Sequence, residues 1–269
     1  MTLDITVGAA TDNGQVRDHN EDGYLVDDDL GLVAVADGMG GHRGGEVASA
    51  TALDALYTAL SGSDEIGEAI GVANDTVYER STIDDGLRGM GTTLTAGIFD
   101  PRGTFTVGHV GDSRAYLLRD GELTRITTDH SLVEELVAAG ELTEEEAERD
   151  PRRSQITRAL GLEPGVEVDL YPVELEAGDR LLLCSDGLTT MLHEAEIAAL
   201  LEEENDPERA AQQLVEAANA AGGVDNITVL VVDVVEAEQD ADDPDDGVED
   251  AADAARPKPK RRGLLRRRQ

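Results

Sequence analysis

Short apolar runs typical of β-strands, set between pairs of helical patterns, limit the folds open to this 269-residue chain. Several runs end in Gly or Asp-Gly turns, as short strands with tight connections do. The expected strands are Leu3–Ala9, Leu32–Ala36, Thr93–Phe99, Thr104–Val110, Ala115–Leu118, Arg180–Cys184 and Ile227–Val235. The expected helices are Gly45–Leu60, Glu65–Ile83, Leu132–Ala139, Ala195–Glu203 and Pro207–Ala221. Strands and helices do not alternate regularly, so the order predicts an α+β fold with helices covering antiparallel sheets.

Charge and composition exclude several classes of function. The net charge of −36 argues against nucleic acid as the main partner, because phosphate binding needs a basic surface. A single cysteine, Cys184, excludes an intramolecular disulfide framework and any multi-cysteine metal site. No apolar run approaches the roughly 20 residues that cross a bilayer, and the first residues carry no signal-peptide pattern. We expect a cytoplasmic protein with no membrane span, acting as a monomer.

Arginine supplies almost all of the positive charge, because Lys258 and Lys260 are the only lysines. Together with many acidic residues, few aromatic residues and no Trp, this composition is typical of extreme halophiles. At molar salt the Debye length is about 3 Å, so repulsion between surface carboxylates is largely screened. A high net charge then favours solubility. We expect a halophilic protein; the alternative is an acidic protein from an ordinary cell.

The last 30 residues, 240–269, differ from the rest of the chain. Asp240 to Asp253 is acidic and rich in Ala, whereas Arg256 to Gln269 is basic. This segment holds 8 acidic and 8 basic residues, so the net charge of −36 belongs to residues 1–239. Low hydrophobicity, Pro and blocks of charge predict disorder. The tail is either a solvated segment, folded back on the acidic core, or a docking segment.

Four aspartates stand at the edges of strand-like runs. Asp37 and Asp186 each follow such a run and precede a Gly, Asp112 follows a third run, and Asp225 precedes the last one. A single Asp at such a place is typical of a turn. Four carboxylates brought together by converging strands would repel one another unless a divalent cation offset their charge. Oxygen ligands favour Mg²⁺, Mn²⁺ or Ca²⁺ over zinc.

Six short motifs in a fixed order extend this pattern. They are Arg17–Asp22, Asp37–His42, Gly91–Thr93, Gly108–Tyr116, Leu183–Leu188 and Gly223–Thr228. In order and spacing they resemble the metal-dependent protein phosphatases of the protein phosphatase 2C type, in their short prokaryotic form. The resemblance covers essentially all of residues 1–235.

The resemblance implies a four-layer α-β-β-α sandwich of two antiparallel sheets flanked by helix pairs. It places a phosphatase domain at 1–239, with a flap insert at about 129–162, and leaves 240–269 as a disordered charged tail. The implied activity is hydrolysis of phosphoserine and phosphothreonine in proteins, by attack of water activated at a centre of two Mn²⁺ or Mg²⁺ ions. The partners would be phosphorylated proteins, the substrates of a Ser/Thr kinase.

Direct metal ligands follow from the resemblance. Asp37 matches the carboxylate that bridges the two cations, and Gly38 matches a backbone carbonyl ligand. A glycine there lets a cation or its water come close. Asp186 and Asp225 match the remaining ligands of the pair. Asp112 matches the carboxylate that helps to hold a third, weaker metal in prokaryotic members.

Arg17 matches the phosphate-binding arginine, whose planar fork can grip two phosphate oxygens. The alternative is an ion pair with Asp18 or Glu21. The resemblance also suggests that Glu21 and Asp22 orient metal-bound waters or Arg17.

Three positions leave their role open. Ser154 matches a serine near the third metal site, but a plain loop serine is the simpler interpretation. Met39 stands where many eukaryotic members have a histidine, and methionine cannot donate a proton. His42 is then the nearest candidate for a general acid, its alternatives being a structural turn histidine or a metal-bound water.

Two other functions remain open at this stage. A catalytically inactive, phosphoprotein-binding relative would lack metal carboxylates, and none of Asp37, Asp186 and Asp225 is missing. A phosphatase of small phosphoesters could use the same fold and metal site, because fold alone does not determine substrate. In the flap segment, arginines 149, 152, 153 and 158 either meet a phosphorylated substrate or pair with the segment's own glutamates.

Overall fold

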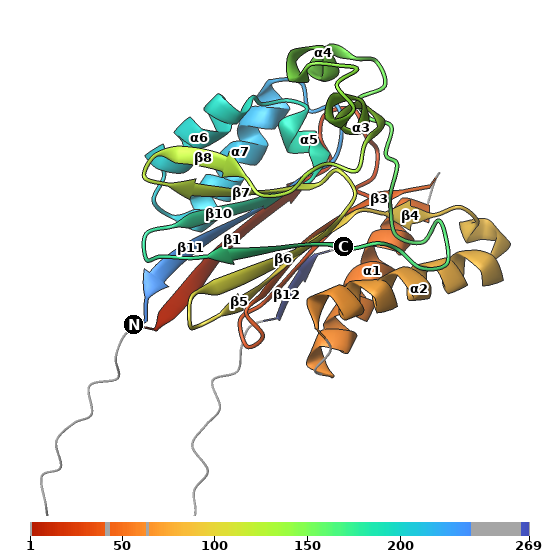
Figure 1. Cartoon of the computed structure of the whole chain (residues 1–269), viewed down its shortest axis with the longest axis horizontal. Coiled ribbons are helices and arrows are strands. Elements are labelled where there is room, and N and C mark those ends of the chain that lie inside the picture. Colours follow the sequence, from red (N-terminus) through yellow and green to blue (C-terminus); the bar gives the residue numbers. More distant parts are fainter. Residues whose placement is uncertain (1, 41–43, 63–64, 238–264, 269) are drawn as a thin grey trace, which may run out of the picture.

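Two antiparallel sheets lie face to face with helices on both outer sides (Figure 1). The computed structural model describes residues 2–40, 44–62, 65–237 and 265–268. The layers follow the order helix, sheet, sheet, helix, which confirms the predicted four-layer sandwich. Residues 238–264 and 269, most of the tail expected to be disordered, lie outside the described residues.

The first sheet has five strands and is built around the longest apolar run. Val and Ile dominate β11, and such residues favour a buried strand. β11 pairs with β1 along ten residues, from Leu3 opposite Glu236 to Asp12 opposite Ile227. The strands, in spatial order, are β1 (Leu3–Asp12), β11 (Ile227–Glu236), β10 (Arg180–Cys184), β7 (Arg114–Arg119) and β8 (Glu122–Arg125).

The second sheet places β2 beside β3, with Asp22 directly opposite Asp37. A two-residue strand, β4 (Gly91–Thr92), pairs with the end of β3. The other strands, in spatial order, are β12 (Leu265–Arg268), β2 (Asp22–Asp27), β3 (Leu32–Met39), β5 (Leu94–Asp100), β6 (Thr104–Val110) and β9 (Asp169–Glu174).

Long helices cover the outer face of each sheet. α1 (Gly44–Ser61) and α2 (Ile66–Ile83) pack on the second sheet, followed by the 3-10 turn η1 (Asp85–Leu87). α6 (Glu194–Glu203) and α7 (Pro207–Ala220) cover the first sheet. The α7 helix begins sharply because Asp206 caps the backbone N–H groups of Glu208 and Arg209 and a proline follows.

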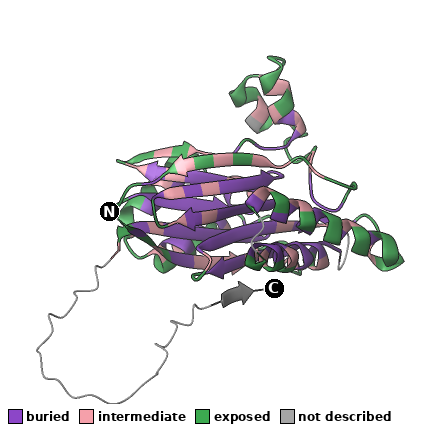
Figure 2. Cartoon of the chain, turned by 60° about the horizontal axis from the view of Figure 1, so that its bottom comes forward, coloured by how far each residue is buried: buried purple, intermediate pink, exposed green. Residues whose placement is uncertain are grey.

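Three apolar clusters hold the layers together. One lies between the sheets and includes Val35, Phe105 and Leu230, and each of the others lies between a sheet and its helices. Close packing requires a glycine in β1, since a Cβ atom at Gly8 would lie 2.1 Å from the backbone carbon of Pro207. Figure 2 shows buried residues through the strands and exposed residues on the outer helix faces.

Segment 129–162 carries two short helices, α3 (Leu132–Ala138) and α4 (Glu144–Arg149), which project from one end of the sandwich (Figure 1). Both begin with a capped first turn, at Ser131 and at Thr143. Arg149 pairs with Glu145, as the second interpretation expected. Arg152 pairs with Asp150 and Arg158 with Asp169, so these partners are aspartates rather than glutamates of the segment.

Several elements were not anticipated from the sequence. The expected runs miss β2, β8, β9 and α4, all of which are short or polar. Asp186 does not lie in a turn; it begins the short helix α5 (Asp186–Thr189). In the tail, Leu265–Arg268 pairs antiparallel with β2. Disorder is therefore wrong for these four residues, which find backbone partners at the free edge of the sheet.

No helix in the described ranges has the length and apolar character that a bilayer crossing needs.

Candidate metal centre

The predicted carboxylates come together at one end of the sandwich, where strands of both sheets finish. Asp37 is near the end of β3, Asp22 begins β2, and Asp186 begins α5 just after β10. Asp186 lies close enough to Asp37 for its charge, in addition to burial, to raise the pKa of Asp37. Asp225 precedes β11 and acts electrostatically on Asp22, Asp37 and Asp186. Residues more than 180 positions apart in the sequence thus form one acidic cluster.

Burial and mutual repulsion raise the pKa values of these carboxyl groups. Burial first, then Asp186 and Asp129, raises the pKa of Asp112 to about 8. Burial also raises the pKa of Asp22 to about 7, against hydrogen bonds from Ser185 and Thr228 that lower it. The pKa of Asp37 rises well above its usual value, through burial and then repulsion from Asp22 and Asp186. When all of these carboxyl groups are ionised, they repel one another and destabilise the folded protein.

A divalent cation fits this arrangement. Within the described part of the chain, Oδ1 of Asp22 and Oδ1 of Asp112 are buried and have no hydrogen-bond partner. A buried carboxylate oxygen without a donor is costly, and a hard cation satisfies it. Among the described residues, no group of three or more His, Cys, Asp or Glu side chains has by itself the geometry to hold a metal ion. A two-cation centre also uses bridging, backbone and water oxygens, which Asp37 and Gly38 could provide.

The backbone around Gly38 leaves no space for a side chain. A Cβ atom there would lie 2.1 Å from the carbonyl oxygen of Gly45 and 2.6 Å from that of Glu21. The Gly38 N–H donates to the Glu21 carbonyl at 3.2 Å. The glycine therefore brings β3, α1 and the loop before β2 into direct contact. This contact positions Glu21, which is half-buried, at the rim of the acidic cluster.

Arg17 pairs with Asp225, with 2.7 Å between its guanidinium nitrogen and Oδ2. The expected alternative, an ion pair with Asp18 or Glu21, is not the contact observed. The Arg17 side chain is about half exposed, at 51%. The hydrogen bond that Arg17 donates to Asp225 raises the pKa of Arg17, against the effect of burial. Arg17 thus lies directly beside the carboxylates, at the solvent side.

Asn226 is a functional residue that the sequence reasoning missed. Its side-chain oxygen accepts from the Glu21 N–H at 2.8 Å. Its side-chain nitrogen donates to the carbonyl oxygens of Asn13 and His19 at 3.0 and 2.8 Å. One buried amide therefore ties the Arg17 loop to the strand that begins after Asp225. Its position next to Asp225, in the motif 223–228, was the available signal.

Buried hydroxyl groups make hydrogen bonds to the aspartates of the cluster. Ser185 Oγ donates to Asp22 Oδ2 at 2.8 Å and accepts from the Thr228 N–H at 3.0 Å. Thr93 Oγ1 accepts from the Asp37 N–H at 2.9 Å and lies 2.8 Å from Ser113 Oγ. All of these hydroxyls are buried. They hold the ends of β3, β10 and β11 in register around the acidic cluster.

A cavity of about 410 Å³ opens beside the cluster, under α3 and α4. Asp112, Ser154 and Asp186 line it together, so the structure places these three predicted residues on one cavity. Ser154 itself is exposed. Met39, which cannot donate a proton, is half-buried at the end of β3. His42 lies outside the described residues.

Comparison with known proteins identifies the family. The family model described as protein phosphatase 2C matches residues 11–219. This chain belongs to the protein phosphatase 2C family. The serine/threonine phosphatase stp of Listeria monocytogenes is 43% identical over 233 residues, which cover 82% of this chain and 92% of that protein.

Solved structures of this family share the fold. A crystal structure of the serine/threonine phosphatase PstP/Ppp of Mycobacterium tuberculosis aligns with a TM-score of 0.80 and 41% identity, covering 88% of this chain and all of that chain. A structure of the PstP catalytic domain in complex with two manganese ions aligns with a TM-score of 0.79, covering 87% of this chain and 100% of that chain. The protein phosphatase 2C fold predicted from the motifs is thereby confirmed.

The raised pKa values give a testable dependence on pH. Between about pH 4 and pH 8, the carboxyl groups with raised pKa values stay protonated in the folded, metal-free protein, whereas the same groups are ionised in the unfolded chain. The free energy of unfolding therefore falls as pH rises through that window. A bound cation removes this penalty at pH 8 but competes with protons at pH 5. We expect saturating Mn²⁺ to raise the Tm by about 5–10 °C more at pH 8 than at pH 5. Scanning calorimetry at constant ionic strength measures this, and equal shifts at both pH values would contradict it.

Proposed function

We propose that this chain is a metal-dependent serine/threonine protein phosphatase that hydrolyses phosphoserine and phosphothreonine. The observation that carries the proposal is the group of converging carboxylates with raised pKa values, with an arginine beside it. Burial, together with the charges of Asp22 and Asp186, raises the pKa of Asp37, and Arg17 lies 2.7 Å from Asp225. The relatives named serine/threonine phosphatases, and the PstP structure with two manganese ions, support the same activity and the same metals.

We assign the ligands of two Mn²⁺ or Mg²⁺ ions to Asp37, Asp186, Asp225 and the carbonyl of Gly38. When bound, these cations supply an activated water and offset charge on the phosphate oxygens. Asp112, with its buried unpartnered oxygen, would hold a third cation, and Ser154 lines the same cavity. Glu21 and Asp22 stand at the rim and floor of the cluster. We assign them to positioning of water and of Arg17.

Arg17 binds the phosphate in this proposal. Its guanidinium is half exposed and already faces the carboxylates, so a phosphate group can reach it from solvent. Asp225 Oδ2 cannot serve a cation and the guanidinium equally well, because both compete for the same lone pairs. Cation binding therefore frees Arg17 to grip two phosphate oxygens in a bidentate manner. Met39 has no proton to donate, so the candidates for the general acid are His42 and a metal-bound water.

Partners and setting stay predictions from the sequence. We propose that the substrates are phosphoproteins produced by a Ser/Thr kinase, so that the chain acts in signalling. We further propose that segment 129–162 is a flap beside the active site, on the domain 1–239. A monomeric state, a cytoplasmic setting and a halophilic source complete the proposal.

Phosphate release from a phosphothreonine peptide in molar KCl tests the proposal. We expect release with added Mn²⁺ and none with excess EDTA, because the carboxylates cannot activate water without a cation. A phosphotyrosine peptide and p-nitrophenyl phosphate serve as parallel substrates. Release from the nitrophenyl ester alone would favour a phosphatase of small phosphoesters. Binding of Mn²⁺ and phosphopeptide without any release would favour an inactive, phosphoprotein-binding relative.

A further inference from the structure

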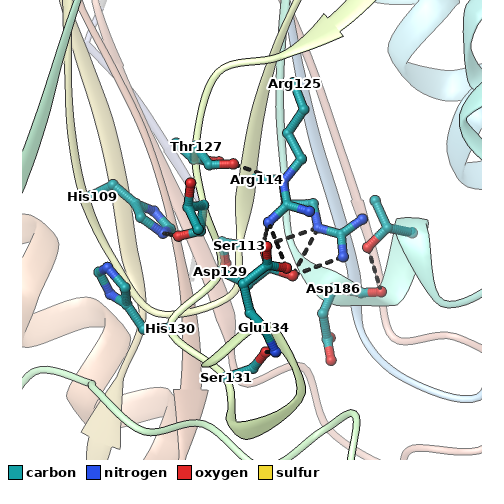
Figure 3. A network of polar contacts seen from close by, with 12 residues as sticks. His109, Ser113, Arg114, Arg125, Thr127, Asp129, His130, Ser131, Glu134 and Asp186 are labelled. Atoms are coloured by element: carbon teal, nitrogen blue, oxygen red, sulfur yellow. Dashed lines mark hydrogen bonds and ion pairs between the residues drawn. The ribbon is translucent and has the colours of Figure 1, made fainter. Parts of the chain in front are cut away.

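Two arginines and two acids form a cluster between the metal-site cavity and the projecting helices. We name Arg114, Arg125, Asp129 and Glu134 the arginine clamp. Asp129 holds Arg114 through both carboxylate oxygens, with nitrogen–oxygen distances of 2.7 to 3.1 Å. It also pairs with Arg125 at 2.8 Å, and Arg125 reaches Glu134 on α3 at 3.6 Å. Figure 3 shows both guanidinium groups turned toward the Asp129 carboxylate.

The clamp stands immediately beside the proposed metal ligands. Arg114 follows Asp112 by two residues, and it lies opposite Cys184 in the β7–β10 pairing, two residues before Asp186. All of these side chains except Cys184 line the 410 Å³ cavity, together with Asp129. The cavity is therefore lined by the Arg114 guanidinium together with two carboxylates, Asp112 and Asp186, that we assign to divalent cations.

A guanidinium and a divalent cation compete for the same carboxylate oxygens. Arg17 already occupies Asp225 Oδ2 in this structure, so such a contact is sterically possible at this site. Arg114 is largely buried, with 25% of its side chain exposed. A buried guanidinium that loses its carboxylate partner is strongly destabilised and takes another one within reach. Glu134 is engaged by Arg125, and the Tyr116 hydroxyl accepts from Arg114 at 3.2 Å. Asp112 and Asp186 line the same cavity and already interact electrostatically with Arg114, so they are partners it can take.

We propose that Asp129 is a positioning residue that keeps the Arg114 guanidinium away from Asp112 and Asp186. By pairing with Arg114 through two oxygens and with Arg125 through one of them, it holds both guanidinium groups at a fixed place. The Asp112 and Asp186 carboxylates then stay open to divalent cations. Asp129 touches neither the substrate nor the cations in this scheme. The inference rests on the proposed metal centre and adds a residue that regulates access to it.

The test is Mn²⁺ binding to the full chain by isothermal titration calorimetry in molar KCl. Asp129→Asn keeps the shape of the side chain but removes its charge. We expect Mn²⁺ to bind about 10- to 100-fold more weakly than to the wild type, the range known for residues that support metal ligands. The matched control is Asp179→Asn. Asp179 is equally buried and holds Arg119, on the same strand, with distances down to 2.5 Å, but outside the cavity. We expect its Mn²⁺ affinity to match that of the wild type.

A second substitution distinguishes competition from simple loss of structure. Adding Arg114→Gln to Asp129→Asn removes the competing guanidinium, so we expect Mn²⁺ affinity to return to within about threefold of the wild type. The Mn²⁺ affinity of Arg114→Gln alone should also stay within about threefold of the wild type. This single variant can be measured even if Asp129→Asn does not fold. Unchanged affinity in Asp129→Asn, or a failure of the double variant to recover, overturns the inference. A tenfold loss in Arg114→Gln alone also overturns it. A wild-type chain that binds no Mn²⁺ instead overturns the proposed metal centre itself.

Discussion

Asp37→Asn should reduce Mn²⁺-dependent phosphate release from a phosphothreonine peptide on the order of 10³-fold. Asp37 is the carboxylate assigned to both cations, and it interacts electrostatically with Asp22 and Asp186 in the acidic cluster. An amide has only one good oxygen ligand and no negative charge, so it cannot bridge two cations. Asp186→Ala and Asp225→Ala should have effects of the same order, because each removes a ligand of the same pair. Steady-state phosphate release with saturating Mn²⁺ measures all three.

The three variants should still fold, so a loss of activity in them cannot be attributed to damage to the core. Each removes one member of a group of mutually repelling carboxylates, so the metal-free variants should melt at or above the wild-type Tm. The matched control is Asp100→Asn. Asp100 ends β5 and makes the ordinary turn contacts, accepting from the Arg102 N–H at 2.8 Å and pairing with the Arg102 guanidinium. Full activity in any of the three metal-ligand variants would refute the two-metal assignment.

Removal of KCl should unfold this protein. Residues 1–239 carry the whole net charge of −36, and at molar salt the Debye length is only about 3 Å. Eleven of the 14 arginines in 1–239 already pair with a carboxylate in the described part of the chain. The arginines of this range are therefore largely engaged already, and they are far too few to offset its 50 acidic side chains. At about 0.01 M salt the screening length rises to about 30 Å and the carboxylates repel across the whole surface.

Far-UV circular dichroism, recorded with EDTA while KCl falls from molar to about 10 mM, checks this prediction. We expect a cooperative loss of the helix and strand signal, reversed when KCl is restored. Sucrose at low salt is the control, because it favours compact states without screening charge. Protection by sucrose equal to that by KCl would assign the effect to solvent exclusion. An unchanged spectrum across the salt range would contradict the halophilic interpretation.

The sequence by itself determined the type of chemistry and the layers of the fold. Carboxylates such as Asp37 and Asp186 follow short apolar runs that are typical of buried strands. This pattern can be read from the local sequence without knowing how the layers pack. Helix pairs were recognisable because apolar residues recur on one face over 14 to 18 residues, as in α1, α2 and α7. These signals are local, so the chain carries them before it folds.

Only the tertiary structure decided which side chains meet. Arg17 pairs with Asp225, 208 positions away, rather than with its neighbours Asp18 or Glu21. The Asn226 amide and the pairing of β12 with β2 likewise join distant segments. In a chain with so many acidic residues, every arginine has many possible partners of equal chemistry. Sheet register and the packing of the layers choose among them, and neither can be read from local sequence.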